Sequence, residues 1–235
     1  MLKHWIVIWC IGIFISCSKE DEDRCLAPSE VNFTFDDVQY WIGEGENKSV
    51  LIVKWNDEKF PDALVWGYKW NSADSARGID MITNIAANDK RFFALRYRDP
   101  ALGYAIAGIG YDINGNNSIQ LNNGTAMQTP VDGIAETTRY DFDDWICTDS
   151  DAHWAAGWYV GYWSYWLGKN GEINGNYKYS GLGASSRKLE NGSIDLWYWD
   201  ANMSSAMGTS GERRASALFA SCKYSSTLTS AEQEW

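Results

Sequence analysis

The amino-acid sequence predicts a mainly β protein of the α+β class, with antiparallel or mixed sheets and one main helix near residues 78–88. Three observations support this prediction. Runs rich in β-branched and aromatic residues recur along the chain, turns containing Gly and Asn separate them, and one stretch has helical spacing. The chain has 235 residues, of which 45% are hydrophobic and 22% charged. It is therefore long enough to bury a substantial core.

Three strands are expected first, over residues 31–41, 50–55 and 64–70. The glycine-containing stretch 43–47 reads as a turn between the first two. In the third strand, side chains alternate between the two faces, so the aromatic residues fall on one face. That face carries Leu64, Trp66, Tyr68 and Trp70.

A helix is expected next, because Ile79, Ile82, Ile85 and Ala86 recur at helical spacing within residues 78–87. Strands over 91–97 and 103–111 follow it. Residues 31–118 therefore form a ββαβ-like N-terminal part, whose element order suggests an antiparallel or mixed sheet with one helix on a face.

The remaining residues, 119–235, form an aromatic-rich β part. Its polar, turn-rich opening at 119–138 is either a long functional loop or a seam between subdomains. Strands are expected over 159–166, 176–179 and 195–199, separated by turns that contain Asn-Gly. The two parts are either one domain or two.

The N-terminus reads as an export signal. Lys3 precedes an apolar run over residues 5–15, which is too short to span a bilayer. The Ser16-Cys17 junction resembles the lipobox of bacterial lipoproteins, which implies a signal peptide over 1–16 and lipid attachment at Cys17. The alternative is a buried or disulfide-bonded Cys17.

Residues 17–30 form an acidic tether, because the charged stretch 18–23 cannot fold alone. An acidic run behind a lipidated cysteine resembles the surface-export signal of lipoproteins from the Bacteroidetes phylum. The resemblance implies a lipid-anchored protein of the outer membrane, exposed at the cell surface. The formal net charge of −11 disfavours nucleic acid as a partner.

The cysteine count suggests one disulfide. With Cys10 in the signal peptide and Cys17 lipidated, Cys25, Cys147 and Cys222 remain, and an odd number leaves one thiol free. Cys25 lies near the tether, whereas the other two lie in the folded body. We therefore predict a disulfide between Cys147 and Cys222.

One stretch alternates oxygen-bearing side chains as calcium loops do, at Asp112, Asn114, Asn116 and Ser118. Its glycine and its twelfth position do not match an EF-hand loop, and Asn-Gly is a strong hairpin-turn signal. We predict a hairpin turn, and calcium binding between Asp112 and Asn116 stays open.

Catalytic groups are few. His153, the one histidine after the signal peptide, could act as a general base or metal ligand, but no nucleophile elbow or H-E-x-x-H pair accompanies it. A packed or solvated loop histidine is the alternative. An acidic cluster could supply the two carboxylates of a glycosidase or be a solvated loop. It comprises Asp141, Asp143, Asp144, Asp149 and Asp151. We expect a non-enzymatic protein without cofactor or metal.

The aromatic content, 15% of residues, exceeds ordinary core needs. Rings on both faces of the strand expected at 159–166 suggest that some line a concave ligand surface, and the alternative is a two-sided aromatic core. The candidate ligand-binding residues are Trp66, Tyr68, Trp70, Trp154, Trp158, Tyr162, Trp163, Trp166, Trp197 and Trp199.

Six motifs resemble a module of Bacteroidetes surface lipoproteins over about residues 31–200. They are VKWND (53–57), ALVWGYKW (63–70), GIDM (78–81), GIGYDIN (108–114), GYWSYW (161–166) and LENGSIDLW (189–197). Such proteins are encoded beside TonB-dependent transporters, and the sequence resembles the corrinoid capture lipoproteins among them in particular. Residues 163–199 also resemble the C-terminal β-domain of transcobalamin-type proteins.

The resemblance implies capture of a nutrient, a corrinoid (cobalamin), and its delivery to an outer-membrane TonB-dependent transporter without covalent chemistry. It would also allow His153 to approach the cobalt. A glycan-binding surface lipoprotein is the alternative ligand class, because sugar rings also stack on Trp. A surface glycoside hydrolase is the alternative of another class.

Overall fold

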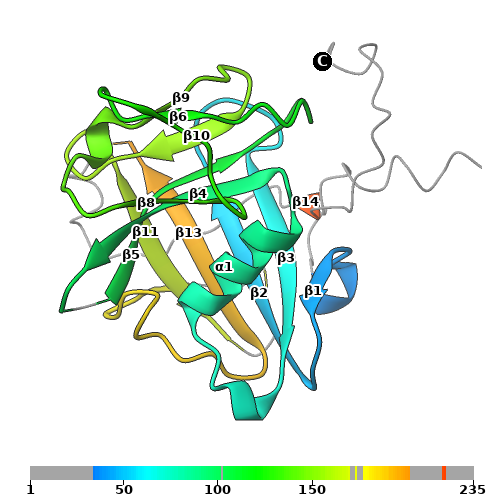
Figure 1. Cartoon of the computed structure of the whole chain (residues 1–235). Helices are drawn as coiled ribbons and strands as arrows, with labels where there is room; N and C mark the ends of the chain where they lie inside the picture. The colour runs from blue at the N-terminus through cyan, green and yellow to red at the C-terminus, as the bar shows by residue number, and fades with distance from the viewer. Residues whose placement is uncertain (1–33, 102, 170–172, 174–176, 202–218, 221–235) are drawn as a thin grey trace, which may run out of the picture.

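The computed structural model describes residues 34–101, 103–169, 173, 177–201 and 219–220. Its largest sheet has seven strands in the order β1-β3-β2-β13-β11-β12, with β14 beside β3 (Figure 1). Pairing is antiparallel between β2 and β3 and along β13-β11-β12, and parallel between β1 and β3, β2 and β13, and β3 and β14. The strands are β1 (Trp41–Gly43), β2 (Asn47–Lys54), β3 (Ala63–Trp70), β11 (Tyr162–Gly168), β12 (Lys178–Tyr179), β13 (Ser193–Asp200) and β14 (Phe219–Ala220).

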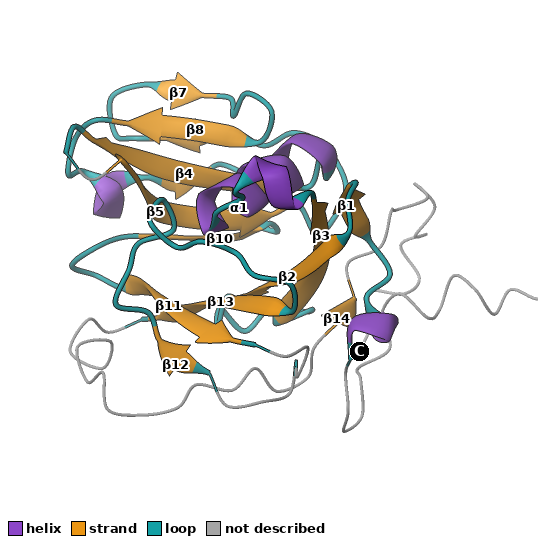
Figure 2. Ribbon diagram, turned by 90° about the horizontal axis from the view of Figure 1, so that it is seen from below, coloured by secondary structure: helices purple, strands orange, loops and turns teal. Residues whose placement is uncertain are grey.

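A second sheet has the order β10-β5-β4-β8. Its strands are β4 (Phe92–Asp99), β5 (Gly103–Tyr111), β8 (Ile134–Thr137) and β10 (His153–Ala156). A third, antiparallel sheet is formed by β7 (Met127–Gln128), β6 (Leu121–Asn122) and β9 (Ile146–Cys147). Figure 2 shows the two larger sheets as separate layers.

The helix α1 (Gly78–Asn88) contacts β1 and β3 of the first sheet and β4 and β8 of the second. It begins after Arg77, whose backbone N–H donates to the Asp80 carboxylate over 2.8 Å. Its buried side includes Ile82 and Ile85. Three short 3-10 helices are also described: η3 (Phe35–Asp37), η4 (Ser72–Asp74) and η5 (Phe142–Asp144). The predicted fold class and the main helix are confirmed.

Within the described residues, apolar side chains form three clusters. The central core lies between the two larger sheets and α1, and includes Leu51, Trp66, Ile82 and Ile109. A second cluster covers the other face of the seven-stranded sheet. A third lies on the face of the four-stranded sheet that points away from the central core. The alternation predicted for β3 is confirmed, because Leu64, Trp66, Tyr68 and Trp70 all enter the central core.

Both parts of the chain contribute to this core. β2 and β13 are neighbours in one sheet, and Trp163 and Trp197 pack in the same cluster as Trp66. The described residues contain no helix that is long and apolar enough to cross a membrane.

Two of the expected strands begin later than predicted, because side chains bind backbone N–H groups there. In the stretch 31–41, Thr34 accepts from Asp36 N–H and the Asp37 carboxylate accepts from Thr34 N–H, which favours η3 in place of a strand. Only Trp41 of that stretch lies in β1, and residues 31–33 lie outside the described residues. In the stretch 159–166, the strand begins at Tyr162 and runs to Gly168.

Other elements were missed or extended. The polar stretch 119–138 contains β6, β7 and β8 and is therefore not one long loop. Strand β10, which pairs with β5, was not predicted. The Asn-Gly turn after β5 does not close a hairpin between neighbouring strands, because β6 pairs with β7 and β9 and not with β5.

Candidate functional site

Six of the ten candidate ligand-binding rings are core residues. Each is at most 7% exposed, and they pack in the central core or the second cluster. These six rings therefore present no exposed face to a ligand in the described structure, and their assignment to ligand binding stays a prediction. The six are Trp66, Tyr68, Trp70, Trp163, Trp166 and Trp197.

Two further candidates are half-buried and fixed by neighbours. Trp154 stacks on Phe93 at 5.4 Å between ring centroids and donates its indole N–H to Trp145 O. Trp199 packs against Trp163 at 5.4 Å and covers Gly161, where a Cβ would collide with the indole. These packing contacts are sufficient to explain the positions of Trp154 and Trp199 without a ligand.

The last two candidates, Trp158 and Tyr162, lie in a set of rings that reaches the surface. We define the aromatic surface as Tyr140, Trp158, Tyr159 and Tyr162. Tyr140 and Trp158 pack on the buried Phe142, Tyr162 packs on Trp158, and Tyr159 follows Trp158 in the chain. Ring centroids are 4.5 Å apart for Tyr97–Tyr140, 5.5 Å for Tyr140–Phe142, 6.3 Å for Phe142–Trp158 and 5.2 Å for Trp158–Tyr162. Tyr140 is 65% exposed and Tyr159 is 74% exposed.

The Asp143 carboxylate holds one side of the aromatic surface in place. It accepts the backbone N–H groups of Trp158, Tyr159 and Val160 over 2.9–3.0 Å. Partial burial alone would raise the pKa of Asp143, but these three donors lower it below its ordinary value. Because the three N–H groups are bonded to Asp143, they cannot join a strand ladder, which explains why β11 begins only at Tyr162.

Three of the four rings of the aromatic surface are phenols, and the fourth, Trp158, is an indole. A hydrogen bond to Tyr140 raises the pKa of Tyr97 to about 12. Burial, followed by the hydrogen bond between the two phenols, raises the pKa of Tyr162 beside Tyr179. The aromatic surface therefore presents flat ring faces together with phenol hydroxyl groups.

His153 is the first residue of β10, an edge strand of the four-stranded sheet, and is completely buried. Its Nδ1 lies 2.9 and 3.0 Å from the two carboxylate oxygens of Asp57, and its ring stacks on Trp55 at 4.3 Å. Burial would raise the pKa of Asp57, but the hydrogen bond and charge of His153 hold it below its ordinary value. An approach of His153 to a bound cobalt is incompatible with this burial.

The loop after β5 is organised by Asp112. The carboxylate is fully buried and accepts the N–H groups of Gly115 and Asn117 over 2.9 and 2.8 Å. Asn114 and Asn116 donate their side-chain amides to Asp149. Among the described residues, no group of three or more His, Cys, Asp or Glu side chains is arranged to hold a metal ion.

The aspartates that could have served a glycosidase have structural partners. Asp141 accepts from the Thr137 hydroxyl and the Trp145 indole, both over 3.1 Å. Asp143 binds the backbone as described, and Asp149 accepts from Asp151 N–H and the two asparagines. These bonds explain three of the five carboxylates without catalysis.

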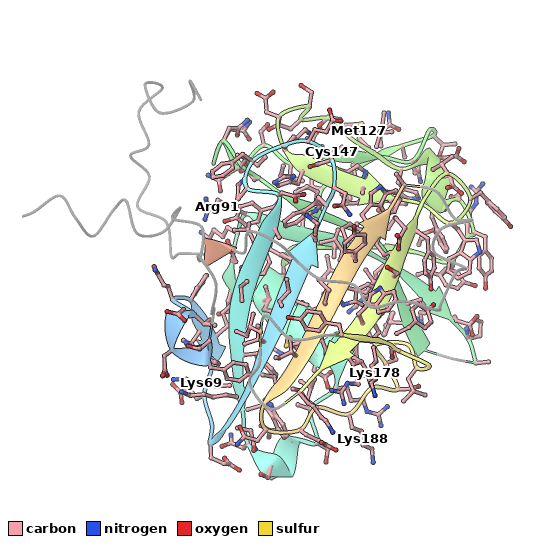
Figure 3. The ribbon with its side chains drawn as sticks, turned by 180° about the vertical axis from the view of Figure 1, so that it is seen from behind. Lys69, Arg91, Met127, Cys147, Lys178 and Lys188 are labelled. Carbon is pink, nitrogen blue, oxygen red and sulfur yellow. The ribbon has the colours of Figure 1, made fainter. Side chains whose placement is uncertain are left out.

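Cys147 is a half-buried free cysteine in this structure, and burial raises the pKa of its thiol. Figure 3 shows it at the same end of the molecule as Met127. Cys222, its predicted disulfide partner, and Cys17, the predicted lipid site, lie outside the described residues. Both assignments stay predictions.

No family model, curated protein or solved structure matches this chain. We therefore infer function from the geometry of the chain itself. That geometry adds three residues to the ligand-binding candidates taken from the sequence: Tyr140, Tyr159 and Asp143. Tyr140 is separated from the Trp158 segment along the chain, and the ring contacts through Phe142 and the backbone bonds to Asp143 bring the two together.

Proposed function

We propose that this protein is a lipid-anchored surface protein that captures a nutrient ligand by ring stacking on the aromatic surface. A corrinoid is the first ligand to test, and delivery to an outer-membrane transporter is the expected next step. Capture needs no covalent chemistry. This proposal takes its ligand from the sequence resemblance and its binding residues from the structure.

The exposure of Tyr140 and Tyr159 is the observation that carries the proposal. Both phenols expose most of their surface, although burying an aromatic ring stabilises a fold. Tyr140 packs on the buried Phe142, which also contacts Trp158, and the Asp143 carboxylate accepts the backbone N–H of Tyr159. Rigid rings held in advance lose little conformational entropy when a ligand stacks on them.

Charge limits the class of ligand. The formal net charge of −11 repels anions, so an uncharged or cationic ligand is favoured. A corrinoid fits because its broad faces are apolar and its rim carries amides. A glycan is the second candidate, because the exposed rings at Tyr140 and Tyr159 end in hydroxyls that can bond sugar hydroxyls as the ring faces stack.

Replacing Tyr140 or Tyr159 with alanine should weaken ligand binding by about 2 kcal/mol each, or roughly thirtyfold, because each removes an anchoring ring. The melting temperature should hardly change, since both side chains are mostly exposed. Isothermal titration with cyanocobalamin and with an oligosaccharide panel measures the affinity. Phe60→Ala is the control, because Phe60 is 59% exposed and lies outside the aromatic surface.

The same panel separates the alternatives. Heat with cyanocobalamin alone supports the corrinoid, and heat with an oligosaccharide alone supports the glycan. Release of shorter sugars from the panel would identify a hydrolase instead. If ligand binds equally well to both tyrosine variants, or if no ligand binds the unaltered protein, the aromatic surface is not the site.

Replacing Cys17 with serine tests the anchor. We expect the variant to lose palmitate labelling and to move from the detergent phase to the aqueous phase on extraction, because a serine hydroxyl cannot take the thioether-linked lipid. Cys10→Ser, within the predicted signal peptide, is the matched control and should label normally. Continued labelling of the Cys17→Ser protein would show that the lipobox assignment is wrong.

A further inference from the structure

A short segment crosses the start of α1 and the start of β5. We name it the strap and define it as residues 184–189, at the end of the molecule where Figure 3 labels Lys188. Backbone hydrogen bonds hold it to the helix: Gly78 N–H to Arg187 O over 2.9 Å, Ile79 N–H to Ala184 O over 3.1 Å, and Leu189 N–H to Ala76 O over 2.9 Å. The Ser185 hydroxyl also bonds the backbone of Tyr104.

Asp195 lies beneath the strap and is completely buried. It is the charged residue of the sequence DLWYW at 195–199, and its carboxylate accepts a hydrogen bond from the Tyr165 hydroxyl. The carboxylate also lies against the first residue of α1, where a Cβ on Gly78 would stand 3.0 Å from its Oδ2. The strap and the helix start together exclude water from Asp195.

The charge of Asp195 is incompletely balanced. Arg187 of the strap brings its Nε within 3.6 Å of Asp195 Oδ1, which is an ion pair but too long for a hydrogen bond. Neither atom makes a hydrogen bond within the part of the chain that the structure describes. A buried carboxylate with one hydroxyl donor and an ion pair that makes no hydrogen bond is poorly stabilised in its ionised form.

We propose that the strap is a pH-sensitive closure: it stays shut over Asp195 while the carboxyl group holds a proton, and opens more often once that group ionises. The reason is hydration. Opening admits water to the carboxylate, which gains far more from solvation when it is charged than when it is neutral.

The groups that face Asp195 are consistent with closure being favoured when the carboxyl group is protonated. They are Tyr165 from β11 and Arg187 from the strap, while α1 contributes the backbone of Gly78. Arg77, at the helix start, donates instead to Ser185 O. Burial raises the pKa of Asp195 to about 6, and Tyr165 and Arg187 only partly oppose the rise.

The sign follows from linkage between protonation and opening. A carboxyl group whose pKa is higher in the closed state binds protons more tightly there, so acid favours the closed state. Closure therefore strengthens as the pH falls through about 6 and weakens above it.

Hydrogen exchange of the full chain tests the proposal. The reporters are the amide protons of Gly78, Ile79 and Leu189, which bond across the strap contacts. After correction for intrinsic exchange, we expect about tenfold greater protection at pH 5.0 than at pH 7.5. Amides of the paired strands β2 and β3 serve as the internal reference and should not follow this change.

Three variants test whether the pH-dependent closure of the strap depends on Asp195 and Arg187 or on ordinary packing. Asp195→Asn should abolish the pH dependence, because its side chain does not ionise. Arg187→Gln should move the midpoint to higher pH, because it removes the positive charge that favours the carboxylate. Lys188→Gln, at the exposed neighbouring position, is the matched control and should leave the midpoint unchanged.

The proposal is overturned if strap protection does not change with pH, or if it changes in parallel with the β2 and β3 amides. It is also overturned if Asp195→Asn keeps the pH dependence, or if Arg187→Gln moves the midpoint downward. These readouts are independent of ligand binding at the aromatic surface.

Discussion

Replacing Trp66 with alanine should lower the free energy of unfolding by about 3–5 kcal/mol, the usual cost of deleting a buried indole. Trp66 is fully buried in the central core and packs edge to face on Phe92 and Tyr111, with ring centroids 5.1 and 5.8 Å away. Its indole N–H also donates to the buried Asp89 over 2.9 Å. The substitution therefore leaves both a cavity and a carboxylate with one donor fewer.

Chemical denaturation measures this loss, and thermal unfolding should show a fall in melting temperature of roughly 6–20 °C. Tyr159→Ala is the control, because that ring is mostly exposed, and it should change stability by less than about 0.5 kcal/mol. A Trp66→Ala protein that loses less than about 1 kcal/mol would mean that Trp66 is not a core residue. It would then return to the set of ligand-binding candidates.

Replacing Asp57 with alanine should cost about 2–3 kcal/mol at pH 7, because it leaves the buried His153 Nδ1 without its partner. The loop between β2 and β3 carries Asp57, whereas His153 lies on β10, so this contact joins the two larger sheets. Asp151→Ala is the control, because Asp151 is an exposed acidic residue close to His153 in sequence.

The effect of Asp57→Ala should depend on pH in a defined direction. His153 holds the pKa of Asp57 below its ordinary value, so the ionised carboxylate stabilises the fold above that ordinary value. That contribution is lost as the pH falls through the lowered pKa of the folded state. The difference in unfolding free energy between the unaltered and variant proteins should therefore shrink in strong acid. A difference that grows there would exclude the Asp57–His153 pair as its source.

Local pattern predicted much of the fold. The spacing of Ile79, Ile82 and Ile85 was enough to place α1, and the alternation in residues 64–70 was enough to orient β3. Strand ends were harder to predict, because side chains decide them. Thr34 and Asp143 bind nearby backbone N–H groups and end or delay a strand, and sequence periodicity does not report such bonds.

The candidate site was predicted less well, and the reason is physical. Alternation shows that two rings share a face but not whether another layer covers that face. Trp66 and Trp158 both looked like candidates, yet α1 and the second sheet close over the first, and loops leave the second half-buried. Tyr140 and Asp57 act through partners distant in sequence, so no local signal pointed to either.

The parallel pairing of β2 with β13 places strong demands on the order of folding. These neighbours lie at the middle of the largest sheet, and a hydrogen bond beside them joins Lys48 to Asn191 across 143 positions. The β2–β3 hairpin can form early, but the inner edge of β2 has no partner until nearly the whole body of the protein has been synthesised. Closing so long a loop costs chain entropy before the contacts between β2 and β13 can offset that cost, so we expect slow folding. During this time the unpaired edge of β2 is exposed and prone to aggregation. For the export that we propose, this delay would be an advantage, since a chain that cannot complete its central sheet early stays competent for translocation.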